Sequence, residues 1–241
     1  IDEQFFVTVK GKRLPRPDFV INRSRSSLIA MHFEKMGCRV FNSAFIAEIC
    51  NHKGKTHQFI NAHQIKSVKT WMGNRHYIPT DSIKGDFPLI LKSVSGHGGN
   101  EVFLIHNQEE LMGKLPLLST DDFILQEVCE QPGVDIRVFV MGNEILAAVK
   151  RYSNNSFKAN VSLGGKAEPY LLKDKERKLV EKIIGLTRFD FVGIDFVLDQ
   201  EGHFLFNEIE DVVGTRTLYA CYNLDVVDKY LVYIKESQET E

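Results

Sequence analysis

The chain has 241 residues, a formal net charge of −2, 43% hydrophobic and 26% charged residues, the balance of an ordinary globular protein. This charge gives no electrostatic case for a nucleic acid or a membrane surface as a partner, and the chain has no apolar run of about 18 residues that would cross a bilayer. The four cysteines are scattered without a CxxC pair, which favours reduced thiols in a cytoplasmic protein over a disulfide framework or a zinc site.

The first part of the chain alternates short strands with helices, as in an α/β layer. We expect strands and helices, in chain order, at residues 5–9, 19–22, 24–34 (helix), 39–41, 43–50 (helix) and 56–64 (helix). Ser24 and Ser43 can cap two of the helices, and Gly37 can end the first in a left-handed conformation. Because Ile1 leads into a strand without preamble, we also expect a further segment before it.

A second unit begins near residue 87 with a strand that ends in Lys92. The loop that follows, residues 93–100, consists mostly of small residues and leads into a strand at 101–106. Backbone N–H groups of such a loop can converge on an anion, with Lys92 as a point charge. The loop has no GK[ST] sequence and is followed by a strand, so it is neither a Walker loop nor a Rossmann fingerprint. Phosphate binding and a plain hairpin loop both remain open.

The segment 123–151 reads as a strand followed by a charged hairpin that turns at Gly142-Asn143. A two-residue turn pairs Arg137 with Ala148 and Asp135 with Lys150. Arg151 then lies on the opposite face unless a bulge intervenes, so Lys150 and Arg151 both stay candidates for the site. Charges at these positions on an apolar hairpin indicate an anion-binding surface.

The last third of the chain is expected to hold a helix at 174–186, a hairpin of strands 191–198 and 203–208, and a helix at 225–235. A regular hairpin puts Asp195 opposite Phe206, so that Asp195 and Glu208 share a face, with Glu210 rejoining them and Asn207 pointing away. Three converging carboxylates need a cation, and oxygen ligands favour Mg²⁺ or Mn²⁺ over zinc. Solvent-facing charges on an edge strand are the alternative.

The order of these features resembles the ATP-grasp superfamily and, within it, the RimK-like carboxylate–amine ligases. The resemblance covers most of the chain and is carried by Asp135-x-Arg137, Lys150-Arg151 and Phe157-Lys158-Ala159-Asn160. It implies an α/β (α+β) ATP-grasp fold in which two α/β lobes clasp ATP beside a partial N-terminal α/β domain. The implied domains are residues 1–77 (partial N-terminal domain and linker helices), 78–126 (central lobe with the glycine-rich loop) and 127–241 (C-terminal lobe with the metal site).

The resemblance also implies roles for the matching residues. Those implied to bind ATP are Lys53, Lys92, Ser95, Gly96, His97, Gly98, Gly99, Gln126, Glu127, Val128, Asp135, Lys150 and Lys158. Those implied to stabilise the transferring phosphoryl group and the acyl-phosphate are Arg137, Arg151 and Asn160. Those implied to hold two Mg²⁺ ions are Asp195, Glu208 and Glu210.

The function that the resemblance implies is ATP-dependent ligation of a small-molecule or peptide carboxylate to an amine. The amine would be a glutamate-type amino acid, and the protein could form a homo-oligomer. Glu210 stands where the family usually has asparagine, Leu163 where arginine is frequent, and Val213 where proline is usual; Arg216 could substitute as a substrate clamp. The main alternative is a catalytically impaired module that binds ATP and Mg²⁺. A dinucleotide-dependent oxidoreductase is disfavoured because no strand–loop–helix with a following acidic residue is found.

Overall fold

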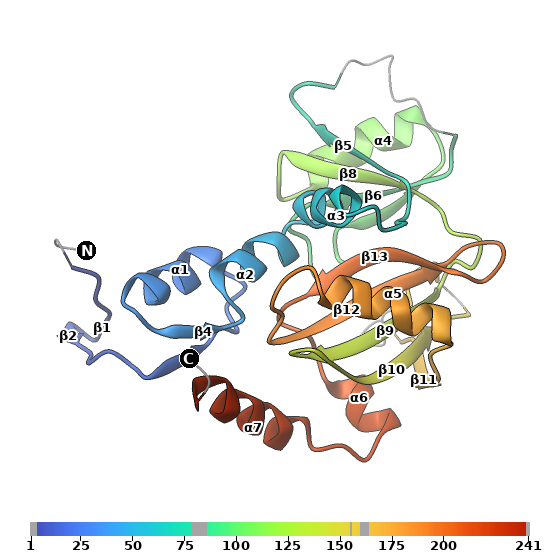
Figure 1. The fold of residues 1–241 in the computed structure, drawn as a ribbon. Helices are drawn as coiled ribbons and strands as arrows, with labels where there is room; N and C mark the ends of the chain where they lie inside the picture. Colours follow the sequence, from blue (N-terminus) through green and yellow to red (C-terminus); the bar gives the residue numbers. More distant parts are fainter. Residues whose placement is uncertain (1–3, 79–85, 155, 160–163, 240–241) are drawn as a thin grey trace.

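The computed structural model describes residues 4–78, 86–154, 156–159 and 164–239. Figure 1 shows three parts: an N-terminal part in blue, a smaller lobe in teal and green, and a larger lobe in yellow-green to orange that lies beside both. Within the described residues, no helix is long and apolar enough to cross a membrane.

The N-terminal part is a parallel strand pair with two helices. Its elements are the hairpin β1 (Thr8–Val9) and β2 (Lys12–Arg13), the pair β3 (Phe19–Ile21) and β4 (Arg39–Phe41), and the helices α1 (Ser27–Lys35) and α2 (Ala44–Cys50). The expected cap Ser43 is confirmed, because its hydroxyl accepts from the Ile46 N–H. The expected cap Ser24 is wrong, since Ser26 caps α1 instead. Gly37 ends that helix at φ +80°, as expected.

The smaller lobe is a four-stranded antiparallel sheet in the order β5-β8-β6-β7. Its elements are β5 (Thr70–Asn74), β6 (Leu89–Ser93), β7 (Val102–Ile105), α4 (Gln108–Lys114), the 3-10 turn η1 (Leu115–Leu117) and β8 (Asp122–Glu127). Strand β5 was not anticipated from the sequence. It precedes residue 78, so the sheet of this lobe also draws on a segment from before the expected boundary.

The larger lobe is a five-stranded antiparallel sheet in the order β11-β10-β9-β12-β13. Its elements are β9 (Val134–Met141), β10 (Glu144–Tyr152), β11 (Lys166–Tyr170), α5 (Asp174–Ile184), β12 (Phe191–Leu198), β13 (Phe204–Glu210), α6 (Arg216–Cys221) and α7 (Val226–Glu239). Helix α5 lies across one face, and α6 and α7 lie below the sheet (Figure 1).

Side chains alternate between the two faces of this sheet. On β9, Ile136 and Val138 join the core under α5, whereas Phe139 packs in a second core with Leu218 of α6. Arg137 is on the same face as Phe139, two residues nearer the smaller lobe. The face that holds an apolar core at one end is therefore charged at the other.

Two β-bulges alter the registers expected from the sequence. In the β9–β10 hairpin an extra residue at Leu146 pairs Val149, not Ala148, with Arg137, and puts Arg151 opposite Asp135. The expected pairing of Asp135 with Lys150 is therefore wrong, and the bulge that would favour Arg151 is present.

The second bulge lies at Asn207 on β13, because Phe206 pairs with Phe196 whereas Glu208 pairs with Asp195. It turns Phe206 into the core under α5 and Glu208 to the opposite face. Asp195 and Glu208 share a face as expected. The expectation that Asn207 points away is wrong, because its side chain lines the cavity described below.

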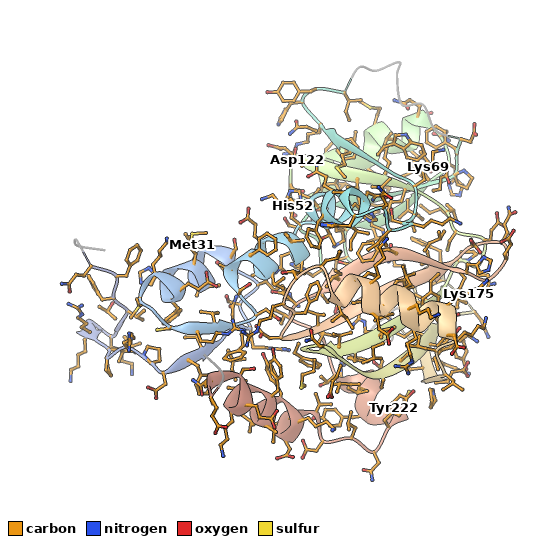
Figure 2. All side chains as sticks on the ribbon, in the orientation of Figure 1. Met31, His52, Lys69, Asp122, Lys175 and Tyr222 are labelled. Atoms are coloured by element: carbon orange, nitrogen blue, oxygen red, sulfur yellow. The ribbon has the colours of Figure 1, made fainter. Side chains whose placement is uncertain are left out.

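Helix α3 (Lys53–Ala62) and the segment after it connect the parts. The Val68 N–H donates to the Phe206 carbonyl at 3.0 Å, and the Phe206 N–H donates to the Lys66 carbonyl at 3.1 Å. The segment leading into β5 is thus hydrogen-bonded to β13 of the larger lobe. At the lower end of that lobe, the Tyr222 hydroxyl donates to the Ala148 carbonyl at 2.7 Å and ties the end of α6 to β10 (Figure 2).

Candidate active site

A cavity lies between the sheets of the two lobes and encloses about 1000 Å³, including its open mouth. The smaller lobe contributes the end of β6, the glycine-rich loop and the end of β8, and the larger lobe contributes β9, β10, β12 and β13. We call this space the first cavity. Its wall combines apolar side chains with several charged side chains that converge on the same space, as is typical of a small-molecule site.

Two lysines donate hydrogen bonds to the glycine-rich loop, residues 93–100. The Lys53 ammonium donates to the Gly96 carbonyl at 2.6 Å, and the Lys158 ammonium donates to the Gly99 carbonyl at 2.6 Å. Gly98 and Gly99 have φ of +65° and +79°, a region that other residues rarely adopt. The loop thus lies against the first cavity, with positive charges beside it.

Two lysines enter the first cavity beside Glu208. The Lys53 ammonium lies 2.8 Å from Glu208 Oε1, and the Lys92 ammonium donates to the Asn207 side chain at 3.2 Å. Burial lowers the pKa of Lys92 to about 8. Both cations point toward the space that the glycine-rich loop borders, which suits an anionic ligand.

A chain of alternating charges crosses the larger lobe's side of the cavity. Arg151 binds Asp135 with two hydrogen bonds of 2.6 and 2.8 Å and also donates to Asp195 at 2.8 Å. Arg137 binds Asp195 with two hydrogen bonds of 2.7 and 2.6 Å, and its third nitrogen lies 2.8 Å from Glu210. Each buried charge has an opposite partner, as burial requires.

The pKa values follow from this pairing. Burial alone would raise the pKa of Asp195, yet the two arginines hold it below its usual value. Burial raises the pKa of Glu210, against the effect of Arg137. Gly193 on β12 leaves room for the Arg137 side chain, since a Cβ at residue 193 would lie 2.6 Å from Val213 and 3.3 Å from the Arg137 side chain.

At the other end of the cavity, strand β8 leads into the link between the lobes. The Gln126 side chain is hydrogen-bonded to the ring of His57 at 2.9 Å, and Glu127 is paired with Lys69 at 2.7 Å. Burial lowers the pKa of His57 to about 4. His57 is thus a buried hydrogen-bonding partner on α3, and His52 caps the same helix.

A second cavity of about 980 Å³ adjoins the first and shares part of its wall. The residues that line both are His97, Gly98, Arg151, Glu208 and Glu210. Apart from Arg137 on β9, the rest of the second cavity's wall consists of residues of the N-terminal part and of the segment after β13, among them Arg25, Asn51, Asp211, Arg216 and Thr217. Arg25, Asp211 and Thr217 were not identified from the sequence, although Asp211 directly follows the predicted metal ligands.

Most residues predicted to bind ATP line the first cavity. The two described exceptions are Ser95, which is exposed outside its wall, and Lys150, which faces away and pairs with Glu168 at 3.1 Å. Arg151 lines both cavities, whereas Arg137 lines only the second. Asn160 and Leu163 lie outside the described residues.

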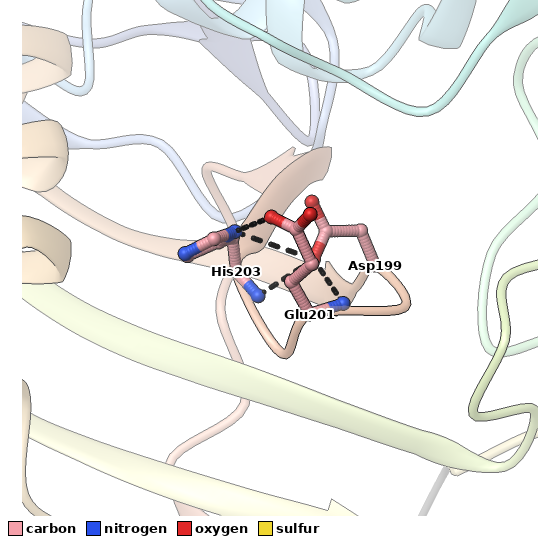
Figure 3. A group of neighbouring side chains, drawn as sticks. All are labelled: Asp199, Glu201 and His203. Atoms are coloured by element: carbon pink, nitrogen blue, oxygen red, sulfur yellow. Dashed lines mark hydrogen bonds and ion pairs between the residues drawn. The ribbon is translucent and has the colours of Figure 1, made fainter.

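The carboxylates predicted to hold Mg²⁺ fit that ion in donor chemistry, since Glu208 and Glu210 present oxygen ligands on the wall between the cavities. Asp195 is more enclosed, and Arg137 lies between it and Glu210. Among the described residues, a closer group of ligand atoms occurs elsewhere, at the tip of the β12–β13 hairpin, where Asp199, Glu201 and His203 lie together (Figure 3). The side chain of Asp199 accepts hydrogen bonds from the backbone N–H groups of Glu201 and His203 in the same turn.

Solved structures with the same arrangement define the fold. The chain superposes on D-alanyl-alanine synthetase A from Vibrio cholerae with a TM-score of 0.74 at 13% identity, covering 99% of this chain and 82% of that one. It also matches the ATP-grasp ligase PsnB, solved with a minimal precursor, at a TM-score of 0.70 and 16% identity, over 97% of this chain and 84% of that one. The expected ATP-grasp fold is therefore confirmed.

The family follows from the sequence. The model of the RimK-like ATP-grasp domain matches residues 50–234, so the chain belongs to the RimK-like ATP-grasp family. It is 29% identical to uncharacterized protein MG012 of Mycoplasma genitalium, over 91% of this chain and 82% of that protein. It is 27% identical to the alpha-aminoadipate–LysW ligase LysX of Saccharolobus solfataricus, over 88% and 79%, and 28% identical to human N-acetylaspartylglutamate synthase A, over 89% and 56%.

Proposed function

We propose that the chain is an ATP- and Mg²⁺-dependent carboxylate–amine ligase that forms an amide or peptide bond through an acyl-phosphate, with release of ADP and phosphate. The observation that best supports this is the wall common to the two cavities. A nucleotide in the first cavity would have its terminal phosphate near Arg151 and Glu208, where a carboxylate in the second cavity can reach it. Binding the two reactants next to each other in this way would make their reaction effectively unimolecular.

Each role rests on a position in the wall of one or both cavities. Lys53, Lys92 and the glycine-rich loop would bind the phosphates, Glu127 and the Val128 backbone the adenine, and Asp135 the ribose. Arg151 and Arg137 would stabilise negative charge on the transferring phosphoryl group, because their guanidinium groups are fixed before a ligand enters. Mg²⁺, when bound by Glu208, Glu210 and Asp195, supplies further positive charge at the phosphates.

A catalytically impaired ATP-binding module is the second candidate. It is favoured by one observation: Glu210, which stands where the family usually has asparagine, is paired with Arg137. This pair occupies a carboxylate that would otherwise be available to Mg²⁺. The names of two relatives, LysX and N-acetylaspartylglutamate synthase A, favour the ligase and support a glutamate-type amino acid as one reactant.

The first experiment is calorimetric titration of the chain with ATP, with and without Mg²⁺. We expect Mg²⁺-dependent binding that weakens roughly 10- to 100-fold in Lys92→Ala, because a buried charge-assisted contact to phosphate is lost. The control is Lys175→Ala, an exposed lysine on α5 (Figure 2). Absence of ATP binding would overturn the proposal.

ADP release, measured over a panel of carboxylic acids and amines, then separates the two candidates. Turnover with an acid–amine pair supports the ligase. Tight, Mg²⁺-dependent ATP binding without ADP release over the whole panel would favour the binding module.

A further inference from the structure

Three polar side chains form a hydrogen-bond network at the end of strand β8, beside the first cavity. The amide nitrogen of Gln126 lies 2.9 Å from Nε2 of His57 and 3.0 Å from the hydroxyl oxygen of Thr70. Gln126 and His57 are each 1% exposed. Thr70 and Ile90 pair with Gln126 from the two neighbouring strands, and Gln126 and Ile90 line the first cavity. Gln126 is thus the member of the network that reaches the cavity, and His57 and Thr70 lie behind it.

The hydroxyl group of Thr70 decides which end of the Gln126 amide faces it. A hydroxyl has one hydrogen, and Thr70 donates it to the Val68 carbonyl at 2.8 Å. Toward Gln126 the Thr70 oxygen can therefore only accept, so the amide presents its NH₂ group there. The same NH₂ group donates to Nε2 of His57, which must then be the unprotonated nitrogen of a neutral ring. Burial lowers the pKa of His57 to about 4, which keeps the ring neutral at pH 7.

The other end of the amide, Gln126 Oε1, is left as an acceptor. None of the described residues donates a hydrogen bond to it, and it is not one of their fully enclosed polar atoms that lack a partner. If the amide turned over, Oε1 would lie against the Thr70 oxygen. Two acceptors would then face each other, or Thr70 would have to give up its hydrogen bond to the Val68 carbonyl. Both are unfavourable, so the network holds Oε1 toward the cavity.

We propose that Thr70 and His57 are positioning residues that set the base specificity of the first cavity, because they hold Gln126 Oε1 as an acceptor for the 6-amino group of a purine and so disfavour a 6-oxopurine nucleotide. The inference rests on the proposed function, in which the adenine lies beside Glu127 and Val128. An amino group at C6 donates to Oε1, whereas a carbonyl oxygen at C6 would face it as a second acceptor. Such mismatches of donors and acceptors are what allow a site to discriminate between ligands of similar shape.

The test is calorimetric titration of the full chain, in the presence of Mg²⁺, with three nucleotides that differ at C6 of the purine. They are ATP, which has an amino group there, purine riboside triphosphate, which has a hydrogen, and ITP, which has a carbonyl oxygen. We expect the affinity of the parent to fall in that order, with ATP bound roughly 10- to 100-fold more tightly than ITP.

Thr70→Val keeps the shape of the side chain and removes the oxygen that accepts from Gln126. The amide is then held by His57 alone, and a neutral imidazole can accept or donate at Nε2 according to its tautomer, so both orientations of the amide become available. ATP should bind more weakly and ITP more tightly, and the preference for ATP should fall at least about fivefold. The affinity for purine riboside triphosphate should stay the same.

Thr70→Ser retains the hydroxyl group and should retain the preference of the parent. Thr8→Val, at an exposed position on β1, is the matched control. Far-UV circular dichroism checks the fold. If Thr70→Val does not fold, the comparison is made with Thr70→Ala, which removes the same acceptor.

The outcomes separate the two ideas. Equal affinities of the parent for ATP and ITP, or a preference for ATP that is the same in Thr70→Val, overturn the inference while the proposed function stands. A loss of affinity by one factor for all three nucleotides in Thr70→Val also overturns it, because Thr70 would then support the fold without selecting the base. If the parent binds none of the three, the proposed function fails, and the inference fails with it.

Discussion

The two cavities differ in how their polar groups are satisfied. In the first, Arg151 is paired with Asp135 and Asp195, and Lys53 with Glu208, so the charges are held in position by the protein itself. In the second, Asp211 keeps an oxygen without a partner. A binding site whose charged side chains are already held in position, such as the first cavity, can bind a ligand without rearranging. The polar groups of the second cavity are less completely paired within the protein itself.

The largest expected effect comes from removing the carboxylate on the wall between the cavities. Glu208→Ala should lower Mg²⁺-dependent ADP release by roughly 100- to 1000-fold, because it removes a ligand of the proposed ion and leaves Lys53 without its partner. ADP release is measured at saturating ATP, with far-UV circular dichroism to check the fold.

Glu201→Ala is the matched control, since Glu201 belongs to the exposed group at the hairpin tip (Figure 3). It should retain the parent's turnover. Loss of ADP release in Glu201→Ala with full activity in Glu208→Ala would move the metal site to that hairpin.

A smaller effect is expected on stability in acid. His57 is buried and its pKa is lowered from 6.5 to about 4, so the folded state favours the neutral ring. This contribution is fully present above pH 6.5 and is lost as the pH falls toward 4. At about 1.4 kcal/mol per pKa unit, it amounts to up to about 3 kcal/mol.

Urea unfolding of the parent and of His57→Gln at pH 7 and pH 4.5 measures this contribution. The variant should lose less free energy of unfolding between the two pH values than the parent does. His63→Gln, at an exposed position at the end of α3, should lose as much as the parent. Equal losses in His57→Gln and the parent would contradict the prediction.

The smallest effect is expected at Lys150, which the bulge at Leu146 directs away from the first cavity. Lys150→Ala should change ATP affinity less than about twofold, since its partner Glu168 lies on the edge strand β11 and partly exposed pairs contribute little. Calorimetry with ATP and Mg²⁺ checks this. A tenfold loss would show that Lys150 reaches the nucleotide after all.

Elements with strong local signals could be predicted from the sequence. Ser43 as a helix cap, Gly37 as a left-handed helix end and the turn at Gly142-Asn143 depend on neighbours within a few residues, and all are found in the structure. The charged residues on strands β9, β10, β12 and β13 could be named because they lie on long alternating strands, whereas Lys53 and Lys158 lie on no strand and were named only through the resemblance to the ATP-grasp family. Strand β5 and strand β11 were missed because Thr70–Asn74 includes a glycine and an asparagine and Lys166–Tyr170 includes a proline, residue types that are depleted in strands.

The bulges could not be predicted, and they decide where side chains point. Alternation alone puts Phe206 and Glu208 on one face of β13. The extra residue at Asn207 sends Phe206 into the core, where it packs edge-on against Phe196, and Glu208 to the site. No local pattern distinguishes this register from a regular one. It follows from the packing of two aromatic rings, which only the folded sheet brings together.

The hydrogen bonds between residues 66–68 and Phe206 have a mechanical consequence. Phe206 directly precedes the bulge that positions Glu208, and the same residue anchors the segment that leads into the smaller lobe. A rotation of the smaller lobe that preserves these two bonds has its pivot at this point. Opening the mouth of the first cavity would then swing the glycine-rich loop through a wide arc, while Glu208, close to the pivot, would stay almost still.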